Sequence, residues 1–197
     1  MKEGAMMDDN RNNRLLFIDT ETGGTDPKKH SLLSIGLAVW DVNDGIIESK
    51  ELFVKNDEYV ITNTAQKINK FDKELHEQNS QSRVSVIRET KKMISKHFPK
   101  SSLVTLAGHN VQFDIGFLKE LYSLEGVSFS KSFSHRAIDT YSILRYLFYT
   151  GKITDDISSS AKAFSYFKIK VSNRHSALGD VLATVELFEK LMKVIGG

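Results

Sequence analysis

Asp19 and Glu21 stand two residues apart at the end of a short apolar run, residues 15–18. Side chains at positions i and i+2 of a strand point to the same face, so these carboxylates would project together. They would repel each other unless a cation lies between them. The following Gly23-Gly24 pair lets the backbone bend or approach a ligand closely. The stretch predicts a metal site for phosphate chemistry; an ordinary strand end followed by a turn is the alternative.

A third acid, Asp114, follows a second short apolar run at residues 103–107. That run predicts another buried strand, so Asp114 would lie near the carboxyl end of a strand, where open sheets build their sites. The alternative is an acid in the first turn of a helix, where the helix dipole favours negative charge.

His175 and Asp180 form the third candidate segment. Five positions of a regular helix rotate by about 140°, so both side chains could not face one ligand from within the same helix. A helix that starts near Ser176 resolves this, because His175 then lies on the loop and Asp180 in the early turns. A surface loop histidine is the alternative for His175. His30, His76, His97 and His135 have no acidic motif around them and are interpreted as ordinary.

Composition limits the kind of protein that can carry these acids. The 197 residues suffice for one well-cored domain, and 40% hydrophobic with 26% charged residues is typical of a globular protein. The sequence has no cysteine, which excludes disulfides, thiolate metal sites and a cysteine nucleophile. No apolar run approaches the roughly 20 residues that cross a bilayer. We therefore expect a cytoplasmic protein without a membrane segment. A net charge of +2 is too small to indicate what kind of partner the protein binds.

Hydrophobic periodicity predicts the elements that would position the acids. Residues 1–13 are polar and are interpreted as a loose leader, followed by a single domain over residues 14–195. Apolar runs and alternation predict strands at residues 15–18, 33–39, 46–54, 103–107 and 136–138. Helical spacing predicts helices at residues 84–98, 113–124 and 178–192, and a further helix through residue 148 that Asp139 caps. Asn43-Asp44-Gly45 is a hairpin signal. Antiparallel strands followed by β-α-β-α indicate an α/β fold with a mixed sheet flanked by helices. Residues 49–81 show no firm period.

Along the chain the candidate residues follow the order D-x-E, then D, then H-x4-D. In this order the sequence resembles the DEDD-type 3′–5′ exonucleases of the histidine subclass, a group that includes proofreading exonucleases, ribonuclease T and oligoribonuclease. The matching blocks are residues 17–24, 107–118 and 173–183, and residues 137–140 also look like the family. The resemblance extends from about residue 15 to residue 191 and implies a ribonuclease-H-like fold with a five-stranded mixed sheet. A mild departure is Gly24-Thr25, where the family more often has Gly-Leu.

The resemblance also implies a chemistry. The protein would hydrolyse phosphodiester bonds from the 3′ end of single-stranded DNA or RNA and release nucleoside 5′-monophosphates. Asp19, Glu21 and Asp180 would hold one divalent cation, and Asp19 with Asp114 would serve a second, directly or through water. His175 would be the general base. Mg²⁺ or Mn²⁺ suits such a site because hard cations prefer oxygen ligands.

Recognition of the chain end needs further residues near these acids. Thr22 and Gly23 would contact the terminal nucleotide through backbone groups. Phe113 and the Ile68-Asn69 region are candidates for stacking on the last bases, with core packing or helix surface as the alternative. Asn110 would orient a catalytic group or the substrate, or cap the following helix.

Alternatives to a free-standing enzyme stay open at this stage. One is a catalytically silent nucleic-acid-binding module of the same fold, and another is a proofreading subunit that binds a polymerase. Some relatives work as homodimers, and the sequence offers no clear oligomer signal. Pattern alone does not distinguish DNA from RNA, because contacts to a 2′ hydroxyl depend on pocket geometry.

Overall fold

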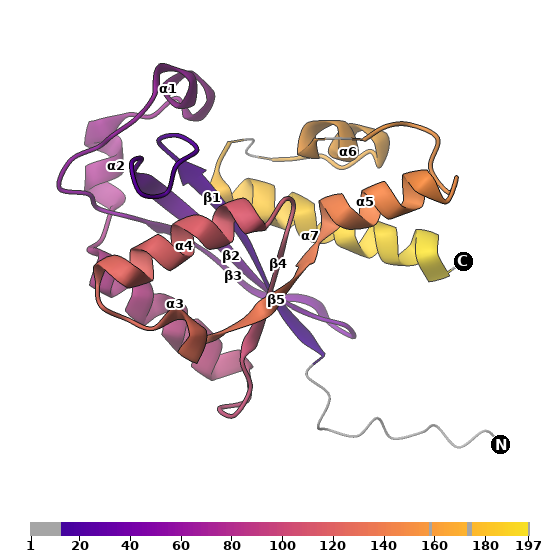
Figure 1. Cartoon of the computed structure of the whole chain (residues 1–197), viewed down its shortest axis with the longest axis horizontal. Coiled ribbons are helices and arrows are strands. Elements are labelled where there is room, and N and C mark those ends of the chain that lie inside the picture. Colours follow the sequence, from indigo (N-terminus) through magenta and orange to yellow (C-terminus); the bar gives the residue numbers. More distant parts are fainter. Residues whose placement is uncertain (1–12, 158, 173–174, 197) are drawn as a thin grey trace.

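A computed structural model of the chain describes residues 13–157, 159–172 and 175–196. The predicted leader at residues 1–13 therefore lies, apart from Asn13, outside the described residues. A five-stranded sheet runs through the centre of the molecule in the order β3-β2-β1-β4-β5 (Figure 1). Its strands are β1 (Arg14–Thr22), β2 (Leu32–Asp41), β3 (Gly45–Phe53), β4 (Val104–Gly108) and β5 (Phe133–Asp139).

The sheet is mixed, as the sequence predicts. β1 pairs antiparallel with β2, and β2 pairs antiparallel with β3 across the Asn43-Asp44-Gly45 turn. β1 also pairs parallel with β4, and β4 pairs parallel with β5. Gly45 has a φ of 70°, a backbone conformation that glycine adopts at little cost. β1 is therefore the central strand, and its carboxyl end lies beside the carboxyl end of β4.

Seven α-helices are found within the described residues. They are α1 (Asn63–Asn69), α2 (Lys73–Asn79), α3 (Arg83–His97), α4 (Gln112–Leu124), α5 (Thr140–Tyr149), α6 (Ser160–Tyr166) and α7 (Ala177–Gly196). A short 3₁₀ helix, η1 (Phe129–Lys131), precedes β5. None of the helices in these ranges combines the length and the apolarity that crossing a membrane requires.

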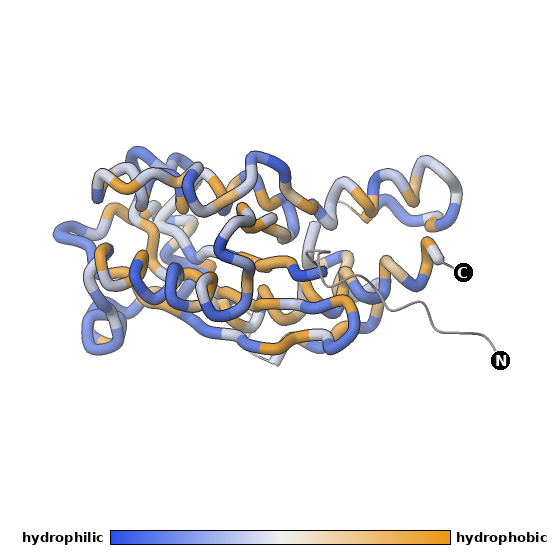
Figure 2. Tube along the Cα trace, turned by 90° about the horizontal axis from the view of Figure 1, so that it is seen from below, coloured by the Kyte–Doolittle hydropathy of each residue, from blue (hydrophilic) through white to orange (hydrophobic). Residues whose placement is uncertain are grey.

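Alternation along β1 divides the core between the two faces of the sheet. Leu16 and Ile18 pack with buried residues of α3 and α4. Phe17, between them, packs on the opposite face against Val181 and Val185 of α7. Figure 2 shows the apolar stretches running through the middle of the molecule and the hydrophilic ones along its margins. The same alternation continues past Ile18, so each face receives a different set of polar side chains at the end of the strand.

Several details differ from the sequence-based expectations. Residues 49–81 contain the short helices α1 and α2, and α6 was not expected at all. Val84 and Leu124 were assigned to apolar helix faces but are 57% and 61% exposed. α3 instead buries Val86, Ile87, Thr90 and Met93. Leu124 is the last residue of α4.

Candidate active site

The carboxyl end of β1 carries the first two acids. Asp19 and Glu21 continue the face of Phe17, and both are partly buried. Thr20 and Thr22 continue the opposite face and are buried. The sequence therefore places two carboxylates on the α7 side of the sheet and two hydroxyls on the α4 side.

The start of α7 lies directly against the sheet at this point. A Cβ on Gly36 of β2 would stand 2.1 Å from the Ala177 carbonyl oxygen, so only glycine allows this approach. The Ala177 backbone N–H donates to Glu51 Oε1 at 3.1 Å, and the Gly179 N–H donates to Ser176 Oγ at 3.0 Å. These bonds fix the first turn of α7, which carries Asp180.

As a result, three acids meet at the end of β1. Single carboxylate oxygens of Asp19, Glu21 and Asp180 lie within 4.8 Å of one another, and all three residues are partly buried. Three anionic groups at this spacing repel one another, and a hard divalent cation relieves that repulsion with the oxygen ligands that it prefers. The donor set therefore fits a divalent metal ion.

Asp114 approaches the same strand from the opposite face. It lies in the first turn of α4 and is not part of the cluster of three. Its Oδ1 accepts a hydrogen bond of 2.7 Å from the Thr20 hydroxyl. Burial raises the pKa of the Asp114 carboxyl to about 7, while bonds from Thr20 oppose the rise and the negative charge of Asp139 adds to it. Without a cation nearby, this carboxyl is thus held largely protonated at mildly acidic pH.

His175 is exposed on the loop that precedes α7. Its backbone adopts the left-handed conformation, with a φ of 66°. Non-glycine residues rarely take this conformation, and such strain gathers at functional sites. The loop position matches the expected helix start near Ser176.

The residues expected to bind the chain end lie in different places. Thr22, Ile68, Asn69 and Phe113 line one cavity of about 470 Å³, together with Glu21. Gly23 does not line it: its N–H donates to the Ser31 carbonyl, and its own carbonyl accepts from the Thr62 N–H, each at 2.7 Å. We call the cavity with Phe113 the terminal cavity.

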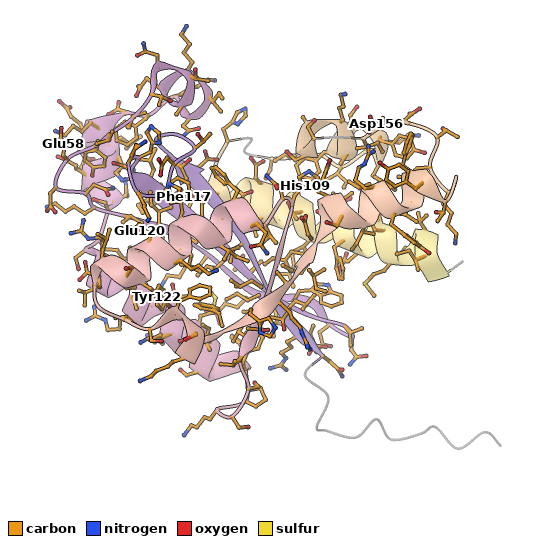
Figure 3. The ribbon with its side chains drawn as sticks, in the orientation of Figure 1. Glu58, His109, Phe117, Glu120, Tyr122 and Asp156 are labelled. Atoms are coloured by element: carbon orange, nitrogen blue, oxygen red, sulfur yellow. The ribbon has the colours of Figure 1, made fainter. Side chains whose placement is uncertain are left out.

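Asn110 lies outside the terminal cavity. It lines a hollow of about 530 Å³ with His109, Tyr141, Ser159 and Ser160, and His109 lies between β4 and α6 in Figure 3. The Asn110 N–H donates to Asp139 Oδ1 at 2.8 Å. No side-chain hydrogen bond caps α4, so the interpretation of Asn110 as a helix cap is wrong.

A second cavity, of about 370 Å³, adjoins the site and was missed by sequence reasoning. Glu21 and Asn69 line both this cavity and the terminal cavity. Its wall includes His76, which the sequence led us to interpret as ordinary. Residues 49–81 supply much of this wall, and their lack of a clear period left no pattern from which the cavity could be predicted.

Comparison with known proteins agrees with this geometry. The family model described as "Exonuclease" (RNase_T) matches residues 16–188. The chain therefore belongs to this exonuclease family, within the DEDD superfamily, and its sheet and flanking helices are those of the ribonuclease-H-like fold. No significant match was found among curated proteins.

Solved structures give the same fold. Escherichia coli exonuclease I in complex with a dT13 oligonucleotide is 20% identical, with a TM-score of 0.77, over 92% of this chain and 41% of that one. The complex with a dA16 oligonucleotide has a TM-score of 0.78 at the same identity and coverage. A product-bound structure of exonuclease I is 18% identical, with a TM-score of 0.75, over 93% of this chain and 44% of that one. This chain thus spans less than half of each of these proteins.

Proposed function

We propose that this protein is a metal-dependent 3′–5′ exonuclease of the histidine subclass, acting on single-stranded nucleic acid and releasing nucleoside 5′-monophosphates. The observation that carries the proposal is the cluster of Asp19, Glu21 and Asp180 beside the terminal cavity. Family membership and the oligonucleotide complexes of exonuclease I support it. We further expect the protein to be cytoplasmic.

Two sets of acids would hold the metal. Asp19, Glu21 and Asp180 would bind one Mg²⁺ or Mn²⁺ ion. Asp19 would serve the second ion together with Asp114, which approaches β1 from the other face, directly or through water. Divalent ions held by these residues would activate the attacking water and offset negative charge on the phosphate. Asp114 has a raised pKa, so it has to lose its proton before it can serve as a ligand.

His175 would accept the proton of the attacking water. Histidine is the side chain that most often serves as a general base in enzymes. His175 is exposed on the loop before α7, the helix whose first turn carries Asp180. As the water attacks phosphorus, the bond to the 3′ oxygen breaks, which leaves a new 3′ hydroxyl on the shortened strand and a free nucleoside 5′-monophosphate.

The terminal cavity would hold the last nucleoside. Phe113 and Ile68 offer apolar contact to its base, and Thr22 lies beside the acids. Asn110 does not line this cavity. We propose instead that it holds the segment before α4 in position, since its N–H donates to Asp139.

The test is a panel of 5′-labelled DNA and RNA oligomers incubated with Mg²⁺ or Mn²⁺. We expect ladders that shorten from the 3′ end, inhibition by EDTA, and resistance of strands that carry a 3′ phosphate. Efficient internal cutting would contradict the exonuclease proposal, and binding without degradation would favour the silent module.

Matched variants locate the chemistry. Asp19→Ala should abolish degradation, whereas Asp44→Ala, which removes an exposed acid from the β2–β3 turn, should not. His175→Ala should slow turnover by about 10²- to 10⁴-fold, and His135→Ala, at an exposed site on β5, should leave it unchanged. A near-normal rate in His175→Ala would remove the general-base role.

A further inference from the structure

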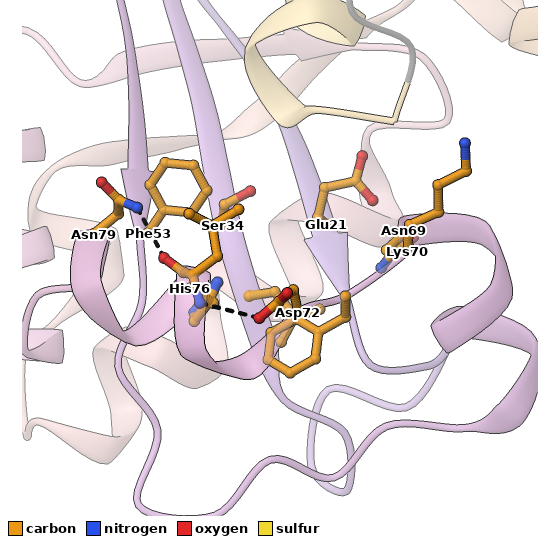
Figure 4. Close-up of a pocket in the computed structure, with 11 residues that line it drawn as sticks. Glu21, Ser34, Phe53, Asn69, Lys70, Asp72, His76 and Asn79 are labelled. Atoms are coloured by element: carbon orange, nitrogen blue, oxygen red, sulfur yellow. Dashed lines mark hydrogen bonds between the residues drawn. The ribbon is translucent and has the colours of Figure 1, made fainter.

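The cavity of about 370 Å³ opens beside Glu21 at the end of the sheet (Figure 4). Most of its lining surface is apolar, and several polar side chains also contribute to it. The lining residues are Glu21, Leu33, Ser34, Phe53, Asn69, Lys70, Phe71, Asp72, Leu75, His76 and Asn79. We call it the aromatic cavity. Its volume lies at the lower end of the range for small-ligand sites, about 300–1,000 Å³.

The wall of the aromatic cavity is rigidly built around His76. The His76 ring is buried, and the rings of Phe53, Tyr59 and Phe71 surround it at centroid distances of 5.7, 5.4 and 5.1 Å. Its Nε2–H donates to the Val54 carbonyl at 3.0 Å, which fixes the ring plane. A preformed aromatic wall of this kind accepts a flat, apolar-faced group, and nucleobases have that shape.

Lys70 stands on the rim and has an unusual backbone. It caps the carboxyl end of α1 in the left-handed conformation, with φ 48° and ψ 42°. This position usually belongs to glycine, because any side chain there is strained. A strained non-glycine residue next to a site suggests that its side chain is kept for a purpose.

The side chain of Lys70 supplies a cation to the rim. In Figure 4 the side chains of Lys70 and Glu21 project in the same direction from the rim of the cavity. Among the described residues, no ion pair includes Lys70. An ammonium group in this position is suited to a phosphate.

Asn69 holds Lys70 in place relative to the acids. Its Nδ2 donates to the Thr22 carbonyl at 2.9 Å, which ties the end of α1 to the end of β1. Asn69 and Glu21 each line both cavities. The end of β1, which carries Glu21, thus also fixes the position of the neighbouring Lys70.

We propose that Lys70 binds the second phosphodiester of the substrate, counted from the 3′ end, and that the base of the penultimate nucleotide enters the aromatic cavity. This assignment rests on the proposed exonuclease function. On the 3′ side of the scissile bond lies only a nucleoside with a free hydroxyl, so a second phosphate must lie on the 5′ side. The penultimate nucleotide connects the two phosphates, and Glu21 and Lys70 both line the aromatic cavity.

Lys70→Gly is the decisive variant, because it changes stability and activity in opposite directions. Relief of the left-handed strain should raise the melting temperature by about 2–4 °C. Loss of one charge-assisted phosphate contact should lower kcat/KM on a single-stranded oligomer by about 10- to 100-fold. Lys70→Arg should keep most of the activity. Lys67→Ala removes a cation from the same helix, at a position that lines neither cavity, and should match the wild type.

Oligomers with one uncharged methylphosphonate linkage locate the contact. With the second linkage neutral, wild type and Lys70→Gly should degrade the strand at similar rates. With the third or fourth linkage neutral, the full difference between them should persist. The assignment is wrong if Lys70→Gly matches Lys67→Ala, or if the difference is the same at every linkage. A wild-type protein that degrades no strand would instead overturn the proposed function itself.

Discussion

The buried carboxyl of Asp114 should make the stability of the metal-free protein fall as pH rises. Its side chain is 5% exposed, and burial raises its pKa from 3.8 to about 7. In the unfolded chain the same carboxyl titrates near its ordinary value, about 3.9. Between these two values the folded state therefore holds a proton that the unfolded state has lost. The contribution of Asp114 to the free energy of unfolding is therefore largest below about pH 4, falls as pH rises to about 7, and stays low above that.

The size of this effect follows from the pKa difference. A difference of this size corresponds to at most about 4 kcal/mol in total, at 1.36 kcal/mol for each pKa unit. Between pH 5 and pH 8 about 3 kcal/mol of it should be lost, because part of the change occurs below pH 5. Asp114→Asn keeps the shape of the side chain and does not titrate, so it should not show this loss.

The assay is urea unfolding of both proteins in EDTA at pH 5 and pH 8. All other titrating groups are shared, so the difference between the two pH dependences isolates Asp114. Thr20→Val removes the hydroxyl that donates to Asp114 at 2.7 Å and should move the titration to higher pH. Equal pH dependence in wild type and Asp114→Asn would refute the reasoning.

Three further predictions follow from the packing and the acid cluster. Gly36→Ala should destabilise the protein by about 1–3 kcal/mol and reduce activity, since the new Cβ would meet the Ala177 carbonyl at 2.1 Å; thermal denaturation and turnover measure both, and a normal melting temperature would contradict the close approach. Tyr122→Phe should stabilise by about 1 kcal/mol, because the Tyr122 hydroxyl is buried without a hydrogen-bond partner among the described residues; a clear loss of stability in urea unfolding would show that the hydroxyl is satisfied. Mn²⁺ at a hundred times its dissociation constant should stabilise the wild type by about 2.7 kcal/mol, and Asp180→Ala should show little of this shift; an equal shift in both would place the ion elsewhere.

Much of the fold was predictable because short-range signals agreed with one another. The apolar run at residues 15–18 identifies the central strand, and β1 extends it to Thr22. The Asn43-Asp44-Gly45 signal predicts the turn between β2 and β3. Asp139 accepts from the Tyr141 N–H and caps α5, as its position before an apolar helix indicates.

Other elements could not be predicted, for physical reasons. α1 buries no residue, and α2 buries only His76, so neither shows an apolar stripe. α6 buries two residues in seven, which is too few to define a period. The outward direction of Val84 depends on how α3 is rotated against the sheet, and several rotations fit the same sequence.

The arrangement of the candidate site was only partly accessible from sequence. Spacing along β1 places Asp19 and Glu21 on one face, and the helix start near Ser176 brings Asp180 to them. The sequence does not reveal that α4 packs on the other face, which directs Asp114 to Thr20. The left-handed backbone of Lys70 was equally hidden, because glycine is the residue that normally marks such a position.

The direction of β1 has a practical consequence for handling the molecule. Arg14 begins the strand at one end of the sheet, and the acids lie at the other (Figure 1). The nine residues of β1 place its two ends about 26 Å apart. If the protein were attached to a bead or a glass surface on the Arg14 side, the acids at the other end of β1 would face the solution. Attachment on the Arg14 side would therefore suit force spectroscopy on a single bound nucleic-acid strand.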